Sequence, residues 1–161
     1  MHIRLRQLDR ALHRRAAFMK ALEDALPLAG LPPSERGILQ IVFLPRDEMA
    51  ELNALHLHHE GATDVITYDL REKSANVPLL PGESPDSRVL AELYVCPSVA
   101  TEYAISCHTS LSHELFLYCI HGMLHLAGED DLTETARASM RAAERRVLDA
   151  VKALGHDINS F

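Results

Sequence analysis

The chain has 161 residues, of which 47% are hydrophobic and 24% charged, and its formal net charge is −7. This length suffices for a real core, and we expect one compact domain over residues 1–161. No apolar run approaches the roughly 18 residues needed to span a bilayer, and no signal-peptide segment follows the charged start. An odd number of cysteines without metal or redox spacing predicts small, buried, reduced thiols at Cys96, Cys107 and Cys119. Together these features predict a soluble, cytoplasmic protein.

The first half of the chain alternates between strand and helix patterns. Residues 2–7 alternate apolar and basic side chains, as a half-buried strand does, and residues 9–26 have helical spacing that ends at Pro27. A β-branched run at 37–44 predicts a central strand, followed by a helix to about residue 58 and a strand at 62–70. Residues 71–88 contain three prolines and a glycine and predict a loop.

The second half is mostly helical. Residues 89–96 predict the last strand, and Pro97 begins a helix to about Ser106. Further helices are expected at about 109–127 and 133–154, the last with Thr133 as its cap. The elements predict an α+β fold in which a small mixed β-sheet of about four strands packs with about five helices. A metal site is expected on a central helix.

The metal site is predicted from the segment His121-Gly-Met-Leu-His125-Leu-Ala-Gly-Glu-Asp-Asp131. Residues four apart lie one turn up the same face of a helix, so both imidazoles can reach one cation. Gly128 is a natural helix end, and the turn after it can deliver Asp131 as a third ligand, with the adjacent Asp130 as the alternative ligand or as a group that orients one. Two nitrogens and one oxygen, with a fourth position for water, are typical of a catalytic zinc site.

Histidines on an apolar helix are more often core or surface groups than ligands. Here they interrupt a strongly apolar run, and a metal would satisfy two imidazoles that are costly to bury unpaired. Zinc peptidases place a glutamate directly after the first histidine as general base, whereas this chain has Gly122. We expect the glycine to permit a close backbone approach and to leave an uncluttered metal face for a bulky substrate such as a nucleic-acid backbone. No protein base is identified, so the catalytic group is expected to be a water on the metal.

The segment resembles the signature His-Gly-x-Leu-His-Leu-x-Gly-x-Asp-His of the bacterial YbeY family of ribosomal-RNA maturation endoribonucleases. Two further stretches are similar to elements of that family in order and spacing. They are Leu52-Asn53 with Thr63-Asp64-Val65-Ile66-Thr67-Tyr68, and Ala91-Glu92-Leu93-Tyr94-Val95. The resemblance covers roughly residues 40 to 150.

The resemblance implies a zinc-dependent single-strand endoribonuclease with one Zn²⁺ per chain, held by His121, His125 and Asp131. It further implies a role in late 3′-end maturation of small-subunit ribosomal RNA and in ribosome quality control. The expected partners are ribosomal RNA and the small ribosomal subunit, with no membrane and no DNA. Two positions depart from the family pattern: Asp131 replaces a third histidine, and Leu57 replaces a common arginine. An anionic ligand reduces the positive charge on the metal, which makes bound water less acidic.

Several polar residues are candidates for contact with the substrate. By resemblance, Thr63 and Asp64 form a wall of the groove, although they are equally typical of a capped strand start. His58 and His59 are candidates to replace the missing arginine, or they are exposed residues at a helix end. Glu114 lies two turns before His121 on nearly the same face, either as a group that orients this ligand or as an exposed first-turn acid.

Two other functions remain open from the sequence. A non-catalytic ribosome-assembly or RNA-binding factor stabilised by zinc would carry the same motif, and so would a metal-dependent hydrolase of another substrate. The acidic net charge runs against RNA binding, which favours a basic surface. Local fields nevertheless steer polyanions, and arginines recur at both ends of the chain, either as solvated helix faces or as RNA contacts. They are Arg4, Arg6, Arg10, Arg14 and Arg15, and Arg137, Arg141, Arg145 and Arg146.

Overall fold

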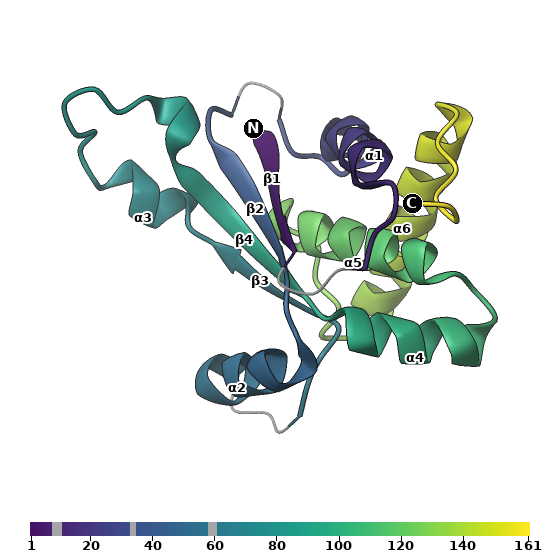
Figure 1. The fold of residues 1–161 in the computed structure, drawn as a ribbon. Helices are drawn as coiled ribbons and strands as arrows, with labels where there is room; N and C mark the ends of the chain where they lie inside the picture. The colour runs from purple at the N-terminus through teal and green to yellow at the C-terminus, as the bar shows by residue number, and fades with distance from the viewer. Residues whose placement is uncertain (8–10, 33–34, 58–60) are drawn as a thin grey trace.

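The protein is a mixed α+β domain built on one four-stranded sheet, as predicted (Figure 1). The computed structural model describes residues 1–7, 11–32, 35–57 and 61–161. The strands lie in the order β1 (His2–Gln7), β2 (Ile38–Phe43), β4 (Val89–Val95) and β3 (Val65–Asp69). The first three run parallel and β3 is antiparallel to β4. The predicted central position of the strand after residue 37 is confirmed, because β2 pairs with neighbours on both sides.

Six α-helices are present among the described residues, one more than the roughly five predicted. They are α1 (Arg15–Leu28), α2 (Arg46–Leu57), α3 (Arg71–Ala75), α4 (Pro97–Cys107), α5 (Leu111–Leu126) and α6 (Glu134–Ala153). The extra helix, α3, lies in the segment predicted as a loop, which also contains a 3₁₀ turn at Pro85–Ser87. Beyond α3 this segment projects away from the body of the molecule (Figure 1). Helix α1 runs one residue past Pro27, so its predicted end at residue 26 is correct to within two residues.

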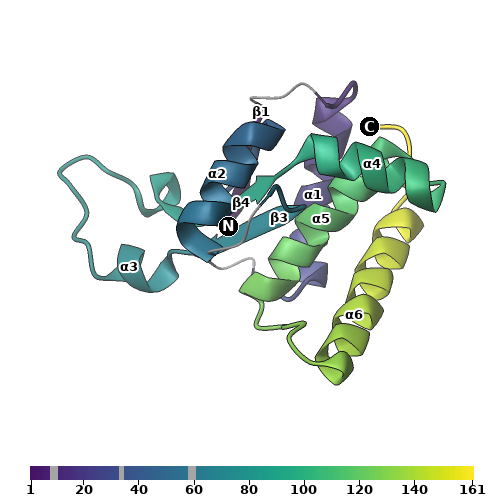
Figure 2. The same cartoon turned by 90° about the horizontal axis from the view of Figure 1, so that it is seen from below.

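One face of the sheet is covered by helices, whereas the other is covered only in part and leaves Arg4 and Arg6 of β1 exposed; β2 accordingly reads as an apolar run interrupted by Gln40. The larger core joins one face to α1, α5 and α6, with Leu39, Ile41 and Leu93 fully buried under these helices. A smaller cluster on the other face joins Val42 and Ile66 to Met49 of α2. Figure 2 shows α2 and α5 on opposite sides of the strands. Helix α5 therefore lies in the interior, between the sheet and the outer helix α6.

Gly122 allows α5 to lie close to the sheet. A Cβ atom built on this residue would be 2.6 Å from Leu93 Cδ2 and 3.0 Å from Thr67 Oγ1, both closer than normal packing allows. The predicted uncluttered metal face at Gly122 is therefore wrong. The residue is buried and faces the strands, because one step along a helix turns it about 100° away from His121. A side chain larger than glycine fits here only if the side chains of the buried Leu93 and of Thr67 move.

Two other predictions from composition can be compared with the structure. No helix among the described residues is long and apolar enough to cross a membrane. Cys96 and Cys119 are buried free thiols as predicted, whereas Cys107 is exposed, which corrects the prediction for that residue. It is exposed because it ends α4, where the chain turns through the left-handed residue His108 before entering α5.

Candidate metal centre

Helix α5 places His121 and His125 side by side. Its first turn is capped by Ser110, whose Oγ accepts a hydrogen bond from the backbone N–H of His113 at 3.0 Å. One turn separates the two histidines, and their Nε2 atoms lie 3.0 Å apart. The ring planes are nearly perpendicular, at 89°. Both rings are partly buried, at the end of the helix where the chain leaves the core.

The turn after α5 brings Asp131 back to the two histidines. Gly128 has a φ of +100°, in the left-handed region that favours glycine, and ends the helix as predicted. The Asp131 carboxylate then lies 3.8 Å from His121 Nε2 and 3.9 Å from His125 Nε2. One ligand atom from each residue lies within 4.8 Å of the other two, a group that can hold a metal ion. The adjacent Asp130 is exposed and instead accepts the backbone N–H of Leu132.

The hydrogen bonds behind the rings determine which nitrogens face the cluster. His121 Nδ1 lies 2.7 Å from Glu144 Oε1, and His125 Nδ1 lies 3.0 Å from the backbone oxygen of Glu129. Both oxygens only accept, so each Nδ1 carries the proton and donates it. In the neutral rings, the two Nε2 lone pairs then face each other across 3.0 Å, with a carboxylate beside them. Such an arrangement is repulsive unless a cation lies between the two nitrogens and the carboxylate oxygen, so these three ligand atoms fit a metal ion.

The electrostatics of His121 also favour a positive charge at this point. Burial opposes protonation of the ring, but the hydrogen bond and charge of Glu144, with the charges of Asp64 and Asp131, together raise its pKa above the usual value. The same carboxylates generate a negative potential that attracts any cation. The cluster is therefore suited to a metal in charge as well as in geometry.

Glu144 is a functional candidate that the sequence did not reveal. It lies on α6, 23 residues after His121, so no helical spacing links the two. The sequence offered Glu114 as the orienting acid or as an exposed one. In the structure the Glu114 side chain is buried rather than exposed, and it accepts a hydrogen bond from Thr109 Oγ1 at 2.5 Å rather than from His121. Only the packing of α6 on α5 identifies Glu144 as the partner of the ring.

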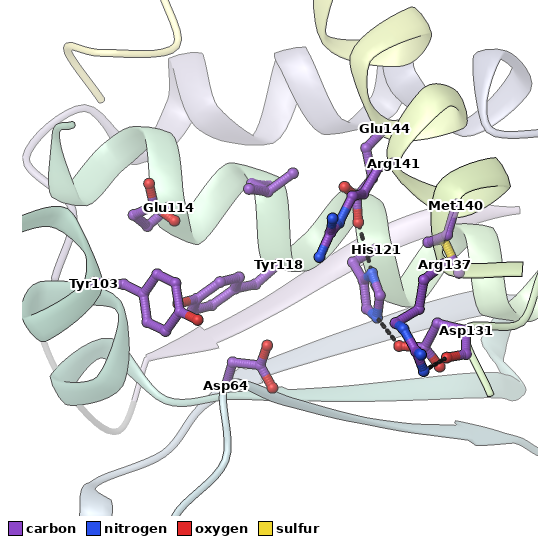
Figure 3. A pocket seen from close by; sticks show the side chains of 11 residues that line it. Asp64, Tyr103, Glu114, Tyr118, His121, Asp131, Arg137, Met140, Arg141 and Glu144 are labelled. Carbon is purple, nitrogen blue, oxygen red and sulfur yellow. Dashed lines mark hydrogen bonds and ion pairs between the residues drawn. The ribbon is translucent and has the colours of Figure 1, made fainter. Parts of the chain in front are cut away.

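The cluster lies where two cavities meet. The helix-side cavity, of about 390 Å³, is bounded by α4, α5 and α6 and includes Tyr103, Tyr118, Arg137, Arg141 and Glu144 in its wall (Figure 3). The strand-side cavity, of about 570 Å³, follows β3 and includes Thr63, Thr67, Asp69 and His125. His121, Asp131 and Asp64 line both. An extended ligand can therefore pass the cluster with room on either side.

The other sequence candidates differ in where they lie. Thr63 and Asp64 border the strand-side cavity, and both predicted interpretations fit, because Asp64 Oδ1 also accepts hydrogen bonds from Thr63 Oγ1 and the Val65 N–H at the strand start. His58 and His59 lie outside the described residues. Thr133 caps α6 as predicted, accepting the Ala136 N–H at 3.1 Å.

Comparisons with known proteins show which family the chain resembles. The sequence matches the family described as Endoribonuclease YbeY over residues 5–152. Endoribonuclease YbeY of Bifidobacterium longum is 34% identical over 128 residues, covering 78% of this chain and 67% of the relative. The protein of the same name from Staphylococcus aureus is 30% identical over 136 residues, covering 83% of this chain and 86% of its own.

A solved structure supports the fold independently. The solution structure of a Thermotoga maritima protein aligns with a TM-score of 0.55, covering 94% of this chain and 92% of that one at 21% identity. At this identity the likeness concerns the fold alone. The family match extends over nearly the whole chain and includes the cluster on α5. This chain belongs to the endoribonuclease YbeY family.

Proposed function

We propose that this protein is a zinc-dependent endoribonuclease that cleaves single-stranded RNA at the cluster of His121, His125 and Asp131. The observation that carries the proposal is the position of the cluster at the junction of two cavities. A polymer can enter by one cavity and leave by the other, which an enzyme cutting within a strand requires. The relatives named endoribonucleases supply the reaction class.

The donor set supports zinc. Two ligands at about 2.0–2.1 Å from a tetrahedral zinc are about 3.4 Å apart. The two Nε2 atoms are 3.0 Å apart, and one oxygen of Asp131 lies 3.8 Å from His121 Nε2 while the other lies 3.9 Å from His125 Nε2, all near that value. Three protein ligands leave one position open, as in catalytic rather than structural zinc sites. When bound, zinc would supply an activated water and polarise a phosphoryl oxygen.

The protein's own residues would orient the metal ligands and the RNA. Glu144 and the backbone oxygen of Glu129 hold the two imidazoles with Nε2 toward the cluster. On the opposite wall, we propose that Thr63 and Asp64 contact the RNA, since hydroxyl and carboxylate groups can hydrogen-bond ribose hydroxyls. His58 and His59 remain candidates for the same contact.

The physiological substrate is proposed from the family. We infer that the protein acts on ribosomal RNA in late 3′-end maturation of the small subunit and in ribosome quality control, in the cytoplasm. The small ribosomal subunit would then be its partner, and neither DNA nor a membrane would be. A large ribonucleoprotein could supply part of the recognition, which accommodates the net charge of −7.

A circular single-stranded RNA tests the proposed activity, because a circle has no ends and only an endonuclease can linearise it. Zinc-loaded protein should open the circle, whereas metal-stripped protein and His125→Ala should not. A duplex of the same sequence should resist cleavage. If zinc-loaded protein binds the circle and leaves it closed, it is a zinc-stabilised RNA-binding factor and the nuclease proposal is wrong.

A further inference from the structure

The helix-side cavity contains a cationic side chain, that of Arg141, with no ion-pair partner in the described part of the chain. Seven acidic or basic residues line it, His121 among them, and the side chains of six have a hydrogen bond or ion pair. Arg137, for example, donates to the backbone oxygens of Asp131 and Leu132. The Arg141 side chain alone among these seven makes no hydrogen bond or ion pair with any part of the chain that the structure describes. Figure 3 shows it reaching from α6 into the cavity beside His121.

None of the surrounding acids forms an ion pair with Arg141 in the described part of the chain. Glu144 is bound to His121, and Glu114 accepts a hydrogen bond from Thr109. Asp131 belongs to the metal cluster, and Asp64 accepts the Thr63 hydroxyl and the Val65 N–H. Arg141 thus presents free guanidinium donors, whose planar fork matches phosphate oxygens.

The opposite end of the same cavity is aromatic. Tyr103 of α4 is 56% exposed, an unusual position for a large ring that has no hydrogen bond from its side chain among the described residues. Next to it in Figure 3 lies Tyr118, whose buried hydroxyl has no hydrogen-bond partner in the described chain. An unpaired buried hydroxyl is costly, and a polar ligand in the cavity would offer it a partner.

A free guanidinium beside the His121 cluster, together with an exposed aromatic ring and an orphaned hydroxyl at the other end of the cavity, forms a set of groups that can hold a single-stranded nucleotide. Proteins bind such strands by pairing cations with phosphates and stacking bases on aromatic side chains. We propose that the helix-side cavity is the subsite for the nucleotide next to the scissile phosphodiester. Arg141 binds its phosphate and Tyr103 stacks on its base. This inference rests on the proposed function and adds the side chains that hold the substrate on one side of the metal.

Binding of a short, single-stranded 2′-O-methyl oligoribonucleotide, which resists hydrolysis, tests the subsite. Fluorescence anisotropy of zinc-loaded protein gives the Kd as a function of salt. Arg141→Gln should weaken binding about fivefold or more and lower the slope of log K against log salt by about 0.7, the value for one lost phosphate contact on a single strand. Tyr103→Ala should weaken binding about fivefold or more, with the slope unchanged.

Arg146→Gln is the matched control, because Arg146 is exposed on the same helix and lines neither of the two cavities at the cluster. It removes the same charge and should leave both the Kd and the slope as in the wild type. Equal effects of Arg141→Gln and Arg146→Gln would overturn the phosphate contact, and wild-type affinity of Tyr103→Ala would overturn the stacking contact. If the wild type itself binds zinc but neither binds nor cleaves RNA, the proposed function fails and the subsite fails with it.

Discussion

Glu144 should control how tightly the site holds zinc, although it is not a ligand. Its Oε1 accepts the Nδ1 proton of His121 at 2.7 Å, and both side chains are mostly buried, at 16% and 20% exposed. A hydrogen bond to a charged group under such conditions contributes about 1.5–3 kcal/mol. Loss of a group that orients a metal-bound histidine typically lowers metal affinity about 10- to 100-fold. We therefore expect Glu144→Ala to raise the zinc Kd by about 10- to 100-fold.

Glu144→Gln separates the hydrogen bond from the charge. Its amide oxygen can still accept the Nδ1 proton, so we expect a smaller loss, about 3- to 10-fold in Kd. A competition titration against a chromophoric chelator measures each Kd, and circular dichroism checks that the variants are folded. Glu134→Ala, an exposed acid on the first turn of α6, is the control and should bind zinc as the wild type does. A folded Glu144→Ala protein with the wild-type Kd would refute the assigned role.

Four further outcomes follow from the same structure. Removing zinc should lower the Tm by about 5–10 °C in a thermal melt, because zinc at 100 times its Kd stabilises the fold by about 2.7 kcal/mol; an unchanged Tm contradicts the metal site. Gly122→Glu should lower the free energy of unfolding in urea by more than about 3 kcal/mol rather than create a peptidase, since its carboxylate would be forced against the buried Leu93 side chain. Asp131→His should retain zinc and shift the acidic limb of the cleavage profile to lower pH, because a neutral ligand leaves more positive charge on the metal. The hydrogen bond from Arg36 lowers the pKa of Asp86 from 3.8 to about 2, so this ion pair should stabilise the wild type above pH 4 and lose that effect as the pH falls toward 2. The Tm of Asp86→Asn should therefore be lower than that of the wild type at pH 7 and equal to it near pH 2.

The main elements of the fold follow from local patterns in the sequence. Alternation at His2–Gln7 and the β-branched run at Ile38–Phe43 both predict strands that the structure contains. The histidine pair predicts a helix, and the glycine after it predicts the helix end and a turn that returns a carboxylate. The structure contains this turn and brings the side chains of His121, His125 and Asp131 together. These predictions succeed because each depends on residues within a few positions of one another.

Features that depend on distant contacts could not be predicted in this way. The function of Gly122 depends on Leu93 and Thr67, which only the closeness of α5 to the sheet reveals. The bond from Glu144 to His121 and the free guanidinium of Arg141 depend on how α6 packs on α5. Helix α3 is five residues long, too short for its apolar spacing to distinguish it from a loop.

Zinc content and RNA cleavage, measured on the same preparations, test the central claim most directly. The preparations are the wild type, His125→Ala and Asp131→Ala, each assayed for bound zinc by atomic absorption and for cleavage of single-stranded RNA. We predict one zinc per wild-type chain, with zinc and cleavage lost together in both variants. Full zinc content and equal cleavage in all three proteins would contradict the assignment of these side chains as the catalytic metal centre.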